Sequence, residues 1–139
     1  MLFNKDLNPS DLTVKCNNTL VSNLGIEFTG ISDDYIKAKM PVDHRTHQPF
    51  GMLHGGASMA LAETLGSIAS HLIVDNSRYI CVGMEINGNH IRPVSSGWVT
   101  GTVHPIHIGK KSHIWEIKIN TEDGKLVCIS RLTMAVIEK

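Results

Sequence analysis

The chain has 139 residues, of which 42% are hydrophobic and 19% charged, and its 13 basic and 13 acidic residues cancel when histidine is neutral. This length fits one domain spanning residues 1–139, and the balanced charge gives no overall field that would favour nucleic acid or an anionic membrane as a partner. No stretch approaches the roughly 20 apolar residues of a membrane span, and the first residues lack a signal-peptide core, so a cytoplasmic location is expected.

The metal-binding residue types show no spacing that indicates a metal site. Three cysteines, Cys16, Cys81 and Cys128, are far apart and odd in number, which argues against a disulfide framework and a zinc cluster and predicts reduced thiols. Six of the eight histidines form two local groups: His44, His47 and His54, and His104, His107 and His113. Neither group has the tight ligand spacing of a zinc site, so no metal is expected.

The first third of the chain predicts short helical turns followed by a β-hairpin. Residues 11–21 favour one or two helical turns with Ser10 as the N-terminal cap. Two strands are predicted at residues 26–31 and 35–42, because apolar and polar side chains alternate along the second. One side of this hairpin should therefore face solvent.

A polar loop at residues 43–50 leads into a long helix that begins at Gly55-Gly56 and ends near residue 74. The helix is apolar on nearly every side, more than packing on one sheet requires, which predicts contacts with another copy of the chain. Glu63 is the only formally charged residue between Arg45 and Asp75. Such a carboxylate either reaches water or lies in a poorly solvated site, where it becomes a candidate base or nucleophile.

The remainder of the chain is rich in strand-forming residues. Four strands are predicted, at residues 79–86, 98–108, 113–120 and 125–137. Asp123-Gly124 is a strong hairpin signal between the last two. The expected fold class is α+β, with an antiparallel sheet wrapped around a single long helix.

The helix N-terminus at Gly55 offers unpaired N–H groups that could stabilise an oxyanion. Glu63 lies eight residues further on, roughly 12 Å along the helix axis, so one helix cannot supply both groups to one carbonyl. Two antiparallel helices from two subunits would bring them together and create two identical sites. Ser67, one turn beyond Glu63, could orient the carboxylate or hold water, while Gln48 and His54 flank the donor.

These residues resemble a known family. The segments His47–Ser58 (HQPFGMLHGGAS) and Leu61–Ser67 (LAETLGS) are similar to the signature of the hot dog fold acyl-CoA thioesterases of the phenylacetate-pathway type. The similarity extends from about Leu24 to the C-terminus, and is greatest to the 1,4-dihydroxy-2-naphthoyl-CoA hydrolases of menaquinone biosynthesis and the proofreading thioesterases of enterobactin synthesis. It implies a central helix wrapped by five to six antiparallel strands, a homodimer that usually forms a homotetramer, and hydrolysis of an aromatic acyl-CoA to acid and free CoA. No cofactor is implied, because CoA enters as part of the substrate.

The resemblance also implies roles for individual residues. Glu63 would be the catalytic nucleophile or general base, the Gly55 N–H would bind the thioester oxygen, Gln48 and His54 would position the thioester, and the Ser67 hydroxyl would lie near the attacking group. Residues expected to contact CoA are Gly83, His90, Ile91, Arg92 and Pro93 in one segment and His107, Ile108, Gly109, Lys110, Lys111 and Ser112 in another. The two lysines form a locally basic turn suited to phosphate.

Other functions fit the same expected fold. One is a non-catalytic acyl-CoA or acyl-carrier binding protein, and another is a thioesterase acting on an aryl group attached to a carrier protein. A dehydratase is disfavoured, because the helix region lacks the paired histidine and acid that it would need. Glu63 favours the thioesterase, since a binding protein has no need of a carboxylate aimed at the thioester.

Overall fold

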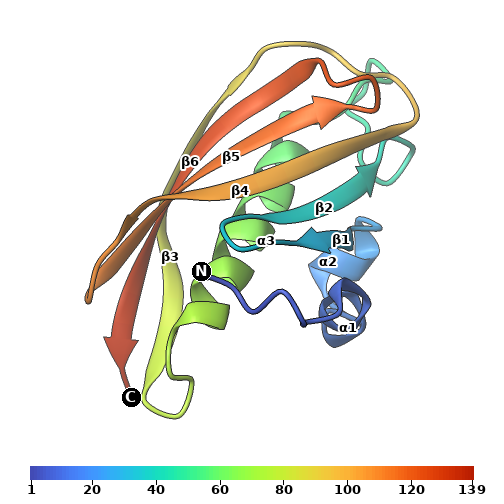
Figure 1. Cartoon of the computed structure of the whole chain (residues 1–139). Coiled ribbons are helices and arrows are strands. Elements are labelled where there is room, and N and C mark those ends of the chain that lie inside the picture. Colours follow the sequence, from blue (N-terminus) through green and yellow to red (C-terminus); the bar gives the residue numbers. More distant parts are fainter.

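The computed structural model describes residues 1–139 and shows one long helix against a single antiparallel sheet (Figure 1). The elements in chain order are α1 (Pro9–Lys15), α2 (Leu20–Asn23), β1 (Glu27–Ile31), β2 (Ile36–Pro41), α3 (Gly55–Ile73), β3 (Tyr79–His90), β4 (Trp98–Ile108), β5 (Ser112–Thr121) and β6 (Leu126–Glu138). This confirms the predicted α+β class with a sheet of six strands.

The sheet has the strand order β1-β2-β4-β5-β6-β3, with every neighbouring pair antiparallel. The predicted turn at Asp123-Gly124 joins β5 to β6, and Gly124 has a φ of 87°, a conformation that glycine adopts without strain. Although β3 follows α3 directly in the chain, it lies at the edge beside β6 (Figure 1). One side of β3 therefore has no strand partner within the chain.

Helix α3 lies across the curved sheet, and its buried residues form the centre of the core (Figure 1). Leu61 and Leu65 pack over Gly101 of β4, while Leu132 of β6 fills the space above Gly66. These close approaches need glycine, because a Cβ at either position would overlap the leucine side chain. These contacts pack α3 closely on the sheet. The opposite side of α3 faces away from the sheet.

A buried polar cluster also joins α3 to β5. The Trp115 indole donates a hydrogen bond of 2.7 Å to Ser70 Oγ, and His113 Nδ1 lies 3.0 Å from the same oxygen. All three residues are at most 3% exposed. Burial, with a smaller contribution from His107, lowers the pKa of His113 below its ordinary value of 6.5.

Two details differ from the sequence-based expectation. The N-cap of α1 is Asn8 rather than Ser10, because Pro9 occupies the first helical position and the Asn8 side chain accepts from the Ser10 amide. Strand β3 continues four residues beyond the predicted end at Ile86. Asparagine and glycine there are poor strand formers, and pairing with β6 overrides that local preference.

The cysteines and helices bear on two other expectations. All three cysteines are free thiols, as predicted; Cys128 is buried and the other two are half-buried. No helix combines the length and apolar character that a membrane crossing requires.

Candidate functional site

The first turn of α3 leaves one backbone amide free. Gly56 N–H donates to His54 Nδ1 at 2.7 Å, and the Ala57 and Ser58 amides donate to the His54 carbonyl oxygen at 3.0 and 3.2 Å. Gly55 N–H has no acceptor within the chain. His54 therefore acts as the helix cap, and the free Gly55 amide at the positive end of the helix dipole is the available donor for an oxyanion.

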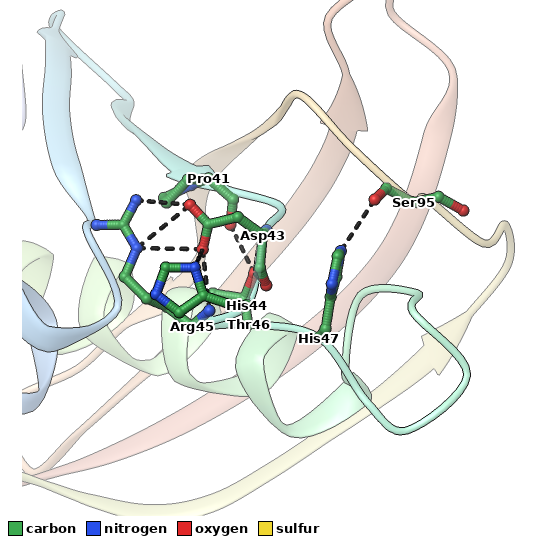
Figure 2. A network of polar contacts seen from close by, with 7 residues as sticks. All are labelled: Pro41, Asp43, His44, Arg45, Thr46, His47 and Ser95. Atoms are coloured by element: carbon green, nitrogen blue, oxygen red, sulfur yellow. Dashed lines mark hydrogen bonds and ion pairs between the residues drawn. The ribbon is translucent and has the colours of Figure 1, made fainter.

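The loop before α3 is held by a polar network shown in Figure 2. Arg45 Nη2 donates to Asp43 Oδ2 at 2.7 Å, and this bond holds the pKa of the Asp43 carboxyl well below its usual range. The buried Thr46 hydroxyl donates to the Pro41 carbonyl oxygen at 2.7 Å. These bonds fix the end of β2 and the start of the loop as one unit.

The second half of the loop positions Gln48. His47 Nε2 lies 2.9 Å from the Ser95 carbonyl oxygen (Figure 2), and the Gln48 amide donates to the Met52 carbonyl oxygen at 2.7 Å. The side-chain oxygen of Gln48 accepts from the Phe50 amide. This orientation leaves the carboxamide NH2 group of Gln48 without a partner in the chain, so it can donate to a ligand.

Gln48 and Gly55 open onto a cleft of about 330 Å³, which we call the donor cleft. It is lined by Gln48, Met52, Leu53, Gly55, Ser58, His90, Ile91, Arg92, Pro93 and Val127. The His90 ring lies against Gly55 so closely that a Cβ built there would be 2.8 Å from His90 Nε2. The structure thus brings the predicted oxyanion donor together with His90, Ile91, Arg92 and Pro93 of the first predicted CoA segment, but not with Gly83.

Glu63 opens onto a different cleft, of about 520 Å³, which we call the carboxylate cleft. Its lining residues are Cys16, Leu20, Val21, Gly56, Met59, Ala60, Glu63, Thr64, Ser67 and Ile68. Glu63 is the only charged residue among them, and it forms no ion pair. The Ser67 hydroxyl lies on the same side, with only a long contact of 3.8 Å to Met134 Sδ. Carboxylate and hydroxyl are both free to bind a reactant.

Glycines in β3 receive the side chains of α3. A Cβ at Gly83 would overlap Glu63 Oε1, and a Cβ at Gly88 would overlap the end of Met59. Gly83, predicted as a CoA contact, therefore has a further role, because its missing side chain gives the Glu63 carboxylate its place. The catalytic candidate lies directly over the edge strand.

The two halves of the predicted site do not meet within one chain. Gly55 and Glu63 line separate clefts and lie about two turns of α3 apart, as the helix geometry predicts. His54 lines neither: it faces a third cleft that adjoins the carboxylate cleft, since Gly56 and Ala60 line both.

The two predicted CoA segments are also far apart. The Arg92 amide donates to the Val127 carbonyl oxygen near the start of β6, whereas the Lys111 carbonyl oxygen accepts from the Val136 amide near its end. Nine strand residues separate these points, which is roughly 30 Å. Lys110 and Lys111 lie exposed at the β4–β5 turn.

Sequence reasoning missed most of the carboxylate cleft. Met59 precedes Glu63 by four residues on α3, a spacing that could have identified it, whereas Ile68 follows by five and falls outside that pattern. Leu20 and Val21 come from α2, and no local signal indicates that this turn lies beside Glu63. No group of three or more His, Cys, Asp or Glu side chains is arranged to hold a metal ion.

The profile of the thioesterase superfamily matches residues 50–128. The proofreading thioesterase EntH of Cronobacter turicensis is 49% identical over 136 residues, covering 98% of each chain. A solved glutamine-to-alanine variant of a Pseudomonas aeruginosa thioesterase has a TM-score of 0.97 and 48% identity, covering 100% of both chains.

A Staphylococcus aureus thioesterase is also similar, and its structure is solved as two variants. One has glutamate changed to alanine, with a TM-score of 0.83 and 38% identity over 86% of this chain and 99% of its own. The other has glutamine changed to alanine, with a TM-score of 0.81 and 38% identity over 84% and 97%. The two substituted positions are 15 residues apart. With a hot dog fold and a profile match over more than half its length, this chain belongs to the thioesterase superfamily and is a thioester hydrolase.

Proposed function

We propose that the protein hydrolyses an aromatic acyl-CoA, with Glu63 of one subunit and the Gly55 amide of the partner subunit acting on the same carbonyl. The observation that carries this proposal is the position of Glu63. It is the one carboxylate of an otherwise uncharged cleft, held over Gly83 of the unpaired edge strand. A partner that pairs with this edge would approach the carboxylate directly.

The chemistry needs only water and these groups. In one route Glu63 takes a proton from water as the hydroxyl oxygen attacks the carbonyl carbon. In the other, the carboxylate attacks first, and water cleaves the resulting anhydride. In both routes the carbonyl oxygen gains charge that the Gly55 N–H stabilises, and the C–S bond breaks. The leaving thiolate takes the proton held by Glu63 in the first route and a proton from water in the second. The products are a carboxylic acid and free CoA.

The contacts between α3 and β3 support a definite register for the dimer. The helix runs antiparallel to the strand, with Gly55 beside His90 and Glu63 beside Gly83. If two β3 edges pair around a two-fold axis at Ile86 or Asn87, Gly83 lies within one residue of the position opposite His90 of the partner subunit. Glu63 then faces Gly55 of the partner subunit, and the two-fold axis repeats the site.

Pairing of this kind would also cover an exposed surface. β3 is 12 residues long, and its Val82 and Met84 side chains are 40% and 66% exposed. A long apolar strand edge in water is a template for association. A homodimer removes this edge and desolvates Glu63, and two such dimers would form the homotetramer that the resemblance implies.

The same register supports CoA as the carrier. Cys81 pairs with Val136, whose amide donates to the Lys111 carbonyl oxygen. In the proposed dimer, Cys81 would also lie near Arg92 of the partner subunit. The two CoA segments, roughly 30 Å apart in one chain, would then be separated by about three strand spacings, or roughly 14 Å. One extended CoA could therefore contact Arg92 of the partner subunit and Lys110-Lys111 of the first.

The Staphylococcus aureus variants support roles for two residues. Gln48 and Glu63 are also 15 residues apart, the spacing between the positions changed in that enzyme. The free NH2 group of Gln48, beside Gly55 in the donor cleft, is suited to hold the thioester oxygen.

Thiol release from benzoyl-, naphthoyl-, hydroxyphenylacetyl- and medium-chain acyl-CoA tests this proposal. Wild type should hydrolyse the aromatic esters, and Glu63→Gln should lower turnover by about 10³-fold or more without loss of fold, because the carboxylate performs the chemistry. Near-normal turnover in Glu63→Gln would refute the mechanism. Tight binding of the esters by wild type with no thiol release would favour the binding-protein alternative, and release only from acylated carrier protein would replace CoA as the substrate carrier.

A further inference from the structure

The carboxylate cleft has a wall that does not belong to the catalytic helix. Its far side is formed by Leu20 and Val21 of α2 and by Cys16 at the C-terminal end of α1. The opposite side is α3, with Met59 and Ile68 on either side of Glu63. The carboxylate cleft therefore lies between α2 and α3.

The cleft is large and apolar compared with the group that Glu63 acts on. Six of its ten lining residues are hydrophobic, and its volume of about 520 Å³ falls in the range of sites that hold drug-sized ligands. An acetyl group would leave most of this space to water. A ring-sized apolar group would fill it and bury the surrounding side chains.

The charge of the cleft also restricts its ligand. Glu63 supplies the single formal charge, which is negative, and Thr64 already donates its hydroxyl to the Ala60 carbonyl oxygen at 2.7 Å. An acyl group with a terminal carboxylate would be repelled by Glu63 and would find no cation in the cleft. The chemistry of the lining thus selects a neutral acyl group.

Local structure fixes α2 as a wall. Thr19 and Ser22 form a reciprocal capping box, and α2 lies against α3. Leu20 lines both the carboxylate cleft and the adjoining cleft that contains His54, and its side chain remains 63% exposed. This residue therefore stands at the junction of the two spaces, with room for a larger or smaller side chain.

We infer that the cleft between α2 and α3 holds the acyl group, and that Leu20 sets the size of the neutral, ring-sized acyl group that the enzyme accepts. The inference rests on the proposed function and specifies its substrate. Leu20 contacts the acyl group away from the reacting carbonyl, so it acts on selectivity and not on the chemical step.

The test compares kcat/KM for acetyl-CoA, benzoyl-CoA, naphthoyl-CoA and succinyl-CoA in wild type, Leu20→Trp and Leu20→Ala. Wild type should favour the two aromatic esters over both acetyl-CoA and succinyl-CoA. Leu20→Trp should lower the naphthoyl-to-acetyl ratio of kcat/KM by about 10-fold or more, because it fills the space beside Glu63. Leu20→Ala should raise the ratio of kcat/KM for naphthoyl-CoA to kcat/KM for benzoyl-CoA.

Val14→Trp is the matched control, because Val14 is also 63% exposed on the N-terminal helices but lines neither cleft. It should leave all ratios unchanged. Wild-type hydrolysis that requires Glu63, combined with unchanged ratios in both Leu20 variants, would overturn the assignment of α2 while leaving the proposed function intact. Efficient hydrolysis of succinyl-CoA would overturn the neutral acyl class, and no hydrolysis of any ester would overturn both.

Discussion

At the scale of single residues, the site depends on two glycines, because their lack of a side chain leaves room for neighbouring groups. Gly83 provides the space in which the Glu63 carboxylate lies, and Gly55 provides the space for the His90 ring. The sequence could identify Gly55, because paired glycines at a helix start are a recognisable signal. Nothing local marks Gly83, since its function arises only when β3 and α3 pack together.

Gly83→Ala should displace the Glu63 carboxylate and lower kcat by roughly 10²-fold, the effect of misplacing a catalytic group by about 1 Å. Thiol release measures kcat, and thermal unfolding checks the fold. Gly30→Ala is the matched control in β1, where a Cβ would meet only Lys37 Cβ at 3.8 Å. Equal activity of the two variants would show that Gly83 does not position the carboxylate.

At the scale of secondary structure, the N-terminus of α3 combines a helix cap with the proposed oxyanion donor. The sequence predicts the start of the helix correctly and assigns His54 to the thioester, but the structure also makes this residue the cap for the Gly56 amide. The residue type and position alone favour a capping or structural histidine, and the structure confirms the cap, although serine, threonine, aspartate and asparagine are the usual caps.

His54→Ala should lower the free energy of unfolding by about 1 kcal/mol, because the Gly56 amide loses its acceptor. His54→Asn keeps an acceptor at the cap and should restore most of that stability in chemical denaturation. Activity measured on both variants separates the roles. A stable His54→Asn with low turnover would assign chemistry to the ring, whereas unchanged stability of His54→Ala would rule out the cap as a source of stability.

The cluster of His113, Ser70 and Trp115 makes the packing of α3 on β5 sensitive to acid. The pKa of His113 is lower in the folded chain than its ordinary value of 6.5, so the unfolded chain binds a proton first as pH falls. This contribution to stability is complete above pH 6.5 and should decrease by roughly 1.4 kcal/mol per pH unit below it, until the folded histidine is protonated.

Urea denaturation between pH 7.5 and 5 measures this dependence. His113→Gln should show a smaller loss of stability over that range than wild type, because the glutamine does not titrate. His44→Gln, at a side chain that is 90% exposed, should behave as wild type does. Identical pH profiles of wild type and His113→Gln would contradict the role assigned to burial of this histidine.

At the scale of the whole molecule, the sequence predicted the fold class and the division of the site, but not the strand order. Strand-forming residues identified β5 and β6, and the Asp123-Gly124 turn identified their pairing. The position of β3 at the far edge depends on long-range pairing with β6, which no local pattern encodes. The register of the proposed dimer depends on that edge, so it too required the structure.

In the proposed dimer, each active site takes Glu63 from one subunit and Gln48 and Gly55 from the other. Mixing two inactive variants, Glu63→Gln and Gln48→Ala, under conditions that exchange subunits tests this arrangement. In a mixed dimer, one site would combine the intact Glu63 of one chain with the intact Gln48 of the other.

Random exchange should therefore restore about one quarter of wild-type thiol release, because about half of the dimers are mixed and each has one intact site of two. Glu63→Gln alone, taken through the same exchange procedure, provides the baseline. Activity that stays at the level of the separate variants, although subunit exchange is shown by mass spectrometry, would place both groups in one chain and contradict the shared site.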